Sequence, residues 1–452
     1  MKVRFGTFLA LIAFVAFAGR AAYILLETRH QQLGVMASSA QRQPAVRRTL
    51  DEYYYANGAV NITRGNAFKE RIPGYPAGTD VALHPPLTEV VLAPVAWATD
   101  GSQLAMRFAL ALSGTAVVVI VGLIGRELAG SRTGLIAASL AAAYPNLWMH
   151  DGLIMSESLS ALTTAAIVLC TYRLVHRPSA RTAAATGLVC GLAALTRSEL
   201  LLLAPLVAAP AVWFGGRGLS RSRRVIAIAI LEAAALLTVA PWIAYNFTRF
   251  KEPVFISYGE GSTLQGANCY RTYHGSNIGF WDGLCAKVDI SHEPSIEAAT
   301  QRRAAFKYME NHAGRLPVVV TARVGRVLGL YQPMAMLKDY QREGKPLWAS
   351  IPGWVMSLAL VPFAIYGVVV WRRRVTLIPL LGVVAIVVVI AAAFYGNFRN
   401  RVPADVVLVV LAAAGIAALS SRWRRADTAD SEAGGQSVTR RGKPSRSSPA
   451  TL

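Results

Sequence analysis

Long apolar segments alternate with short basic segments along most of the chain. A helix needs about 20 apolar residues to cross a bilayer, and ten segments approach this length. They lie at 5–26, 103–125, 134–151, 153–173, 182–196, 199–214, 225–245, 350–370, 375–395 and 402–420. The pattern predicts an all-α polytopic membrane protein with about ten transmembrane helices.

Composition supports this fold class. The 452 residues are 54% hydrophobic and 16% charged, which is too apolar for an ordinary soluble domain. The formal net charge of +21 comes from 46 basic and 25 acidic residues. Because the basic residues stand in short clusters between apolar segments, they indicate membrane topology, and we expect no nucleic-acid partner.

The basic clusters also predict which side each loop faces. An N-terminus in the cytoplasm places alternate clusters there, around Arg126, Arg173, Arg223, Arg373 and Arg424, as the positive-inside rule requires. The outer side then receives a first loop, 27–101, a long loop, 246–350, and a short link, 395–401. We expect one membrane domain, 1–423, followed by a disordered basic cytoplasmic tail, 424–452.

Two outer segments are predicted to lie along the membrane surface as amphipathic helices. Pro85 to Ala98 is 14 residues long, which gives about 21 Å of helix and is too short to cross. In the long loop, Arg315, Arg323 and Arg326 fall on one face of a helix whose other faces carry valine and leucine, a pattern typical of an interfacial helix.

The first outer loop contains an acidic pair followed by three tyrosines, Asp51-Glu52-Tyr53-Tyr54-Tyr55. Carboxylates beside a bilayer experience a falling dielectric, which raises their pKa and suits them to act as bases near neutral pH. Aromatic rings beside them suit a sugar. The alternative is an acidic turn with tyrosines at the membrane interface, where tyrosine is common.

Further polar groups stand at the outer ends of other segments. His84 precedes Pro85, and Glu157 lies about one turn inside a span, where an ionisable side chain is a functional candidate. The alternatives are a helix entry for His84 and a helix-capping acid for Glu157. Arg399 and Arg401 lie outside against the positive-inside trend, so they either hold a lipid phosphate or contact bulk headgroups.

Two of the four cysteines, Cys269 and Cys285, fall in the long polar loop. We expect them to form a disulfide bond if this loop lies in an oxidising compartment. Cys170 and Cys190 lie inside apolar segments, where a thiol behaves as a small hydrophobic group.

With these residues in hand, the chain resembles the GT-C superfamily of integral-membrane glycosyltransferases. Within it, the chain is similar to bacterial relatives of protein O-mannosyltransferases and of lipid A aminoarabinose transferases, of actinobacterial type. The resemblance covers most of the chain. It rests on Asp51-Glu52, His84-Pro85-Pro86-Leu87, Met155-Ser156-Glu157, the segment 191–197, Pro241-Trp242 and the segment 399–403.

The resemblance implies an inverting transfer of a sugar from a polyprenyl-phosphate donor to an extracytoplasmic acceptor, which is a glycan, lipid or protein. The enzyme would be a multi-pass protein of the plasma membrane with its active site on the extracytoplasmic face. Asp51 or its neighbour Glu52 would be the catalytic base. Arg399, Arg401, His84 or a divalent metal would stabilise the leaving phosphate, and Glu52 and Glu157 would bind a metal or sugar hydroxyls.

Two other classes remain as alternatives. A transporter or lipid flippase would also need many spans, but transporters usually show internal repeats and helices broken at the midplane. This sequence shows no internal repeat, and its polar groups gather on one face. A structural assembly subunit would leave Asp51, Glu157 and Arg401 without a common explanation.

Overall fold

The computed structural model describes residues 4–40, 50–69, 75–76, 78–216, 219–286, 289, 292–373 and 375–439. Within these ranges the regular structure is helical, apart from one isolated antiparallel bridge between Lys69 and Asp80. The predicted all-α fold class is confirmed for this part of the chain.

Seven helical segments of the described chain are long and apolar enough to cross a membrane. They are Phe5–Arg29 of α1 (Phe5–Ala40), α4 (Gln103–Ala129), α7 (Glu157–His176), Ser198–Gly215 (η2, η3 and α9), α10 (Arg221–Phe247), α16 (Leu347–Trp371) and Phe398–Ser421, which joins η6 (Phe398–Arg401) to α18 (Val402–Thr439). Three shorter helices are also apolar: α3 (Leu87–Ala98), α8 (Ala180–Ala194) and α17 (Ile378–Ala393). The predicted count of ten spans is therefore not confirmed.

The predicted span 134–151 is not one helix. Helix α5 (Ser131–Ala143) ends before Tyr144, whose extended backbone (φ −76°, ψ 111°) precedes Pro145. A residue before proline is disfavoured in the helical region, and proline has no amide hydrogen to continue a helix. The chain instead makes two short turns, α6 (Pro145–Trp148) and η1 (Met149–Gly152), at the end of the bundle.

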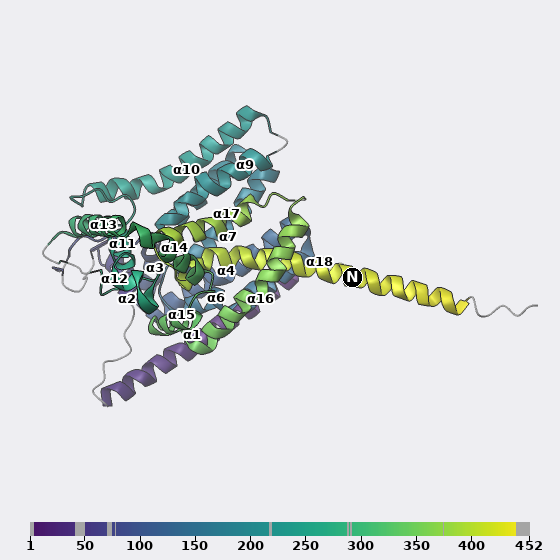
Figure 1. Cartoon of the computed structure of the whole chain (residues 1–452), viewed down its shortest axis with the longest axis horizontal. Coiled ribbons are helices and arrows are strands. Elements are labelled where there is room, and N and C mark those ends of the chain that lie inside the picture. The colour runs from purple at the N-terminus through teal and green to yellow at the C-terminus, as the bar shows by residue number, and fades with distance from the viewer. Residues whose placement is uncertain are drawn as a thin grey trace, which may run out of the picture.

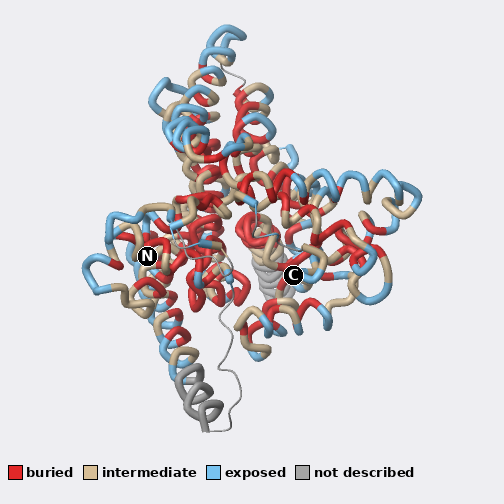
Figure 2. The backbone as a smooth tube through the Cα atoms, turned by 90° about the vertical axis from the view of Figure 1, so that its left-hand side faces the viewer, coloured by how far each residue is buried: buried red, intermediate tan, exposed pale blue. Residues whose placement is uncertain are grey.

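The long helices pack closely through small residues. A Cβ atom on Gly367 of α16 would lie 2.1 Å from the carbonyl oxygen of Leu411 in α18. A Cβ atom on Gly187 of α8 would likewise lie 2.1 Å from the carbonyl oxygen of Leu231 in α10. Small residues at such positions let helix backbones approach in a membrane, where van der Waals packing replaces the hydrophobic drive. Buried residues accordingly concentrate where these helices meet (Figure 2).

The short polar helices gather at one end of the long ones (Figure 1). They are α2 (Leu50–Thr63), α11 (Glu260–Ala267), α12 (Tyr270–Tyr273) and α13 (Pro294–Asn311), with the apolar helix α3 and the helices α14 (Leu316–Val327) and α15 (Pro333–Arg342) beside them. Helix α18 projects from the opposite side. It continues past residue 424, where the disordered tail was expected to begin, as far as Thr439. Residues 440–452 of that predicted tail lie outside the described residues.

The predicted interfacial position of α14 is wrong for its arginines, because Arg323 and Arg326 are each only 1% exposed. Arg323 Nη1 donates hydrogen bonds to the carbonyl oxygens of Ala392 and Ala393, at 3.1 and 3.2 Å. These carbonyls end α17 and have no partner within their own helix. Arg326 Nε donates to the Ile278 carbonyl at 2.7 Å. Helix α14 therefore joins the long outer loop to the end of α17.

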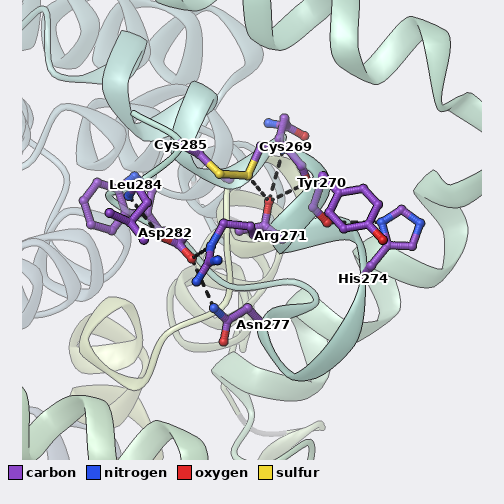
Figure 3. The surroundings of a disulfide bond; sticks show 12 residues. Cys269, Tyr270, Arg271, His274, Asn277, Asp282, Leu284 and Cys285 are labelled. Carbon is purple, nitrogen blue, oxygen red and sulfur yellow. Dashed lines mark hydrogen bonds and ion pairs between the residues drawn. A yellow bond between two sulfur atoms is a disulfide. The ribbon is translucent and has the colours of Figure 1, made fainter. Parts of the chain in front are cut away.

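A disulfide bond between Cys269 and Cys285 closes a small loop beside α14 (Figure 3). Inside it, Asp282 accepts hydrogen bonds from Arg271 Nε at 2.6 Å and from Asn277 Nδ2 at 3.2 Å. The disulfide joins the two ends of this loop, and the contacts of Asp282 hold its interior in one conformation.

Candidate active site

Arg399 lies between two carboxylates from distant parts of the sequence. Its Nη1 is 2.7 Å from Asp51 Oδ2, and its Nε forms an ion pair with Glu157 Oε1. Asp51 lies in the first turn of α2, Glu157 in the first turn of α7 and Arg399 in η6. We refer to Asp51, Glu157 and Arg399 as the central cluster. Three of the predicted site residues are thus in direct contact.

Local contacts fix the position of Arg399. The Asn397 side chain accepts a hydrogen bond from the Arg399 amide at 3.1 Å and so caps η6. The amide of Gly396 donates to the Gly279 carbonyl at 3.0 Å. A Cβ on Gly396 would lie 2.1 Å from the Arg323 carbonyl oxygen, so only glycine fits against α14 at this position.

The charge state of Asp51 differs from the prediction. Burial raises the pKa of a carboxyl, but the Arg399 guanidinium and His84 hold the pKa of Asp51 well below its ordinary value. His84 Nε2 lies 3.2 Å from Asp51 Oδ1, while Arg399 engages Oδ2. The expectation of a raised pKa is wrong for Asp51, because it took account of the membrane and not of these partners.

The tyrosines after the acidic pair hold His84. The ring of Tyr55 stacks on the His84 ring with centroids 5.2 Å apart, and Tyr54 meets it edge-on at 5.1 Å. Both tyrosines are buried, whereas Tyr53 is 42% exposed. Tyr54 and Tyr55 therefore orient the histidine toward Asp51, and Tyr53 alone has a ring available to solvent.

Glu52 lies apart from the central cluster. It is 3% exposed and pairs with Arg107 of α4 at 2.7 Å, and it also accepts from the Ile154 amide at 3.4 Å. Adjacent residues of a helix point about 100° apart, because a turn holds about 3.6 residues. Asp51 and Glu52 therefore face different neighbours, and the geometry favours Asp51 as the group that meets a substrate.

Arg401 does not join the central cluster either. Its Nη2 lies 2.9 Å from Asp405 Oδ1, one turn further along α18. Asp405 also accepts a hydrogen bond from the Tyr144 hydroxyl at 2.9 Å. The predicted phosphate ligand Arg401 is therefore occupied within the helix bundle, and Arg399 is the arginine beside the carboxylates.

Arg401→Ala is expected to lower the stability of the folded protein. Removing one partner of a buried ion pair leaves the other charge uncompensated and costs about 3–5 kcal/mol. Thermal unfolding in detergent would measure the loss. The double variant Arg401→Met with Asp405→Leu removes both charges and should recover most of the stability. An Arg401→Ala protein as stable as wild type would contradict a structural role for the Arg401–Asp405 ion pair.

Two basic residues that were not predicted as site residues border the central cluster. Arg197 Nη1 lies 3.5 Å from Glu157 Oε1, while Arg197 Nε pairs with Glu199 at 2.7 Å. Lys345 is fully buried and pairs with Glu343 at 2.5 Å, and the other Glu343 oxygen lies 3.8 Å from Arg399. In the sequence, Glu343-Gly344-Lys345 looks like an ordinary exposed turn, so no local signal marks Lys345.

The side chains around the central cluster do not form a suitable set of ligands for a divalent metal ion. Among the described residues, no group of three or more His, Cys, Asp or Glu side chains could hold a metal ion. The carboxylates of Asp51 and Glu157 instead share the Arg399 guanidinium. We therefore derive no catalytic step through a metal.

The fold is that of known membrane glycosyltransferases. The archaeal oligosaccharyltransferase AglB from Archaeoglobus fulgidus, in complex with an inhibitory peptide and a dolichol-phosphate, matches with a TM-score of 0.54 and 15% identity over 95% of this chain and 52% of that chain. Its apo form matches with a TM-score of 0.54 and 16% identity over the same shares. The chain thus spans about half the length of these structures. ArnT from Cupriavidus metallidurans bound to undecaprenyl phosphate has a TM-score of 0.40 and 14% identity, over 87% of this chain and 78% of that chain.

The two AglB matches show the fold: it is GT-C-like, as the sequence resemblance predicted, and seven helical segments of the described chain are long and apolar enough to cross a membrane. More particularly, residues 83–245 match the family described as dolichyl-phosphate-mannose-protein mannosyltransferase. The matched segment contains His84, Glu157 and Arg197 of the site. A search of curated proteins finds no match to the chain. The narrower aminoarabinose-transferase and actinobacterial resemblance stays a prediction.

Proposed function

We propose that the protein is an inverting glycosyltransferase that moves a sugar from a polyprenyl-phosphate donor to an extracytoplasmic acceptor. The observation that carries the proposal is Arg399, held between Asp51 and Glu157 beside the gathered polar helices. Arginine presents a planar fork that suits phosphate, and Asp51 is a partly exposed carboxylate within reach of the same ligand. The matching family description names a dolichyl-phosphate sugar, and the AglB complex holds a dolichol-phosphate.

In the proposed reaction, the acceptor hydroxyl oxygen forms a bond to the anomeric carbon while the bond from that carbon to the phosphate oxygen breaks. Asp51 takes the hydroxyl proton as general base. Arg399 stabilises the charge that develops on the leaving lipid phosphate. Because the displacement is a single step with attack opposite the leaving group, the anomeric configuration inverts.

Donor binding would also adjust the base. Arg399 pairs with Asp51 and lowers its pKa, which makes Asp51 a weak base. A phosphate competes for the same guanidinium and reduces its hold on the carboxylate. Asp51 then becomes a stronger base only when a donor is in place, which would limit unproductive proton transfer.

The proposed location is the extracytoplasmic face of the plasma membrane. The disulfide loop belongs to the same end of the molecule as the central cluster, and disulfide bonds persist in oxidising compartments. The donor would reach the site from the outer leaflet, so membrane lipid is a direct partner. The acceptor would be a glycan, lipid or protein. No observation favours a transporter or flippase.

The test uses the full chain in lipid nanodiscs with a panel of labelled polyprenyl-phosphate sugars and a cell-envelope acceptor extract. We expect label to leave one class of donor and free polyprenyl phosphate to accumulate. Folded protein that releases no label from any donor, yet moves such lipids across vesicle membranes, would refute the glycosyltransferase and support a flippase.

A further inference from the structure

Four buried polar atoms beside the central cluster have no hydrogen-bond partner within the described part of the chain. They are both ring nitrogens of His150, the hydroxyl of Tyr340 and the second carboxylate oxygen of Glu157, Oε2. The three residues are 2%, 1% and 0% exposed. They come from three separate elements, η1, α15 and α7.

Contacts tie these residues to one another and to Arg399. The rings of His150 and Tyr340 meet edge-to-face with centroids 6.3 Å apart. Lys345 Nζ lies 4.1 Å from the centre of the Tyr340 ring and pairs with Glu343, which in turn faces Arg399. The unpartnered atoms therefore border the candidate active site.

The position of His150 is fixed by its neighbours in the chain. Asp151 pairs with Arg20 of α1 and accepts a hydrogen bond from the Ser158 hydroxyl at 2.5 Å. The Tyr23 hydroxyl donates to the Met149 carbonyl at 3.1 Å. Helices α1 and α7 thus hold η1 in place, and the imidazole is buried without using either of its nitrogens.

Leaving buried polar atoms without partners costs free energy, and native proteins rarely do so without a reason. The four atoms offer a specific combination of groups. A neutral imidazole supplies one donor and one acceptor, a phenol supplies both, and a carboxylate oxygen accepts. Hydroxyl groups also donate and accept, so a ligand with several neighbouring hydroxyls would satisfy all four atoms.

The local charges favour an uncharged ligand at His150. Burial and the Lys345 ammonium hold the pKa of His150 well below its ordinary value, so the imidazole is neutral. The Glu157 carboxylate already faces Arg399 and Arg197. Lys345, Arg399 and Arg197 lower the pKa of His150 and only Glu157 opposes them, so these three cations would also disfavour an ammonium group of a ligand beside the imidazole.

We propose that His150, Tyr340 and the free oxygen of Glu157 form a subsite that binds the hydroxyl groups of the donor sugar and selects an uncharged aldose over an amino sugar. This inference rests on the proposed glycosyl transfer and adds the class of sugar. Tyr340 and His150 are binding residues in this proposal, whereas Asp51 and Arg399 act at the reacting atoms.

The test measures binding of two lipids to the full chain in nanodiscs: a polyprenyl-phosphate sugar and polyprenyl phosphate without a sugar. Tyr340→Phe removes one hydroxyl and keeps the ring against His150 and Lys345. It should weaken binding of the sugar donor by about five- to tenfold, as expected for one lost hydrogen bond, and leave binding of the sugar-free lipid unchanged. His150→Phe should act in the same direction.

Tyr308→Phe is the matched control, because the Tyr308 hydroxyl is also buried without a partner but packs against Tyr273 and His312 in the outer loop. It should change neither affinity. Tyr340→Phe protein that binds the sugar donor as tightly as wild type would overturn the subsite, as would wild-type preference for an amino-sugar donor over its hydroxyl counterpart. Failure of wild-type protein to bind either lipid would instead refute the proposed donor, so the two failures are distinguishable.

Discussion

Asp51→Asn is expected to lower the rate of sugar transfer by about 10²–10⁴-fold, the usual cost of losing a general base. The amide has nearly the shape of the carboxylate, and Arg399 keeps Glu157 as its partner, so the variant should fold and still bind donor. Release of labelled sugar under saturating donor would measure the rate. Donor binding, measured separately, would show that the site is intact.

Glu52→Gln is the control for that experiment. Glu52 is adjacent in the sequence but pairs with Arg107, away from Arg399. Its loss should reduce stability and leave the rate per folded molecule near wild type. An Asp51→Asn protein that is well folded, binds donor and turns over at a near-normal rate would end the assignment of Asp51 as base.

Arg399→Gln is expected to weaken donor binding by about 10–100-fold. Loss of a hydrogen bond to a charged group costs about 1.5–3 kcal/mol, and each 1.4 kcal/mol is a factor of about ten in affinity. The dependence of transfer on donor concentration would measure the change. Arg399→Lys keeps the positive charge but cannot donate two parallel hydrogen bonds to a phosphate, so its affinity for the donor should lie between those of Arg399→Gln and wild type. An unchanged donor dependence would exclude Arg399 as the phosphate ligand.

The same variant should change the pH profile. Arg399 is the largest cause that lowers the pKa of Asp51, so its removal raises that pKa toward or above the ordinary range of a carboxyl. A base works only when deprotonated, so activity should be lost at a higher pH in Arg399→Gln than in wild type. A purely structural role for Arg399 would reduce activity equally at all pH values.

Much of the central cluster was predictable from sequence. Glu157 and Arg399 each stand at the end of a predicted span and Asp51 stands in the first predicted outer loop, and the predicted topology brings all three to one side of the membrane. The choice between Asp51 and Glu52 was not predictable, because it depends on the partner of each helix face. Only the structure shows Arg107 beside Glu52 and Arg399 beside Asp51.

Two structural features that the sequence prediction did not anticipate had signals in the sequence. Arg401 and Asp405 are one helical turn apart, a spacing at which opposite charges pair, and this favoured an internal ion pair over a phosphate ligand. Pro145 interrupts the predicted span 134–151, and a proline inside a helical pattern marks a break. A prediction based on hydropathy alone takes account of neither the Arg401–Asp405 spacing nor the proline.

Other features had no local signal. His150 lies far from Tyr340 and Lys345 in the chain, and its ring meets that of Tyr340 only when η1 and α15 pack together. The arginines of α14 show the same amphipathic pattern whether they face lipid headgroups or the carbonyls at the end of another helix. Long-range packing decides between these outcomes, and hydrophobic periodicity does not report it.

The attachment of α14 to the end of α17 links the disulfide loop to the segment that carries Arg399. Gly396 contacts the Arg323 backbone on one side and is hydrogen-bonded to Gly279 of the disulfide-closed loop on the other. Arg399 follows three residues later. A macromolecule that moved the disulfide loop would therefore also move Gly396 and, three residues later, the Arg399 guanidinium between Asp51 and Glu157.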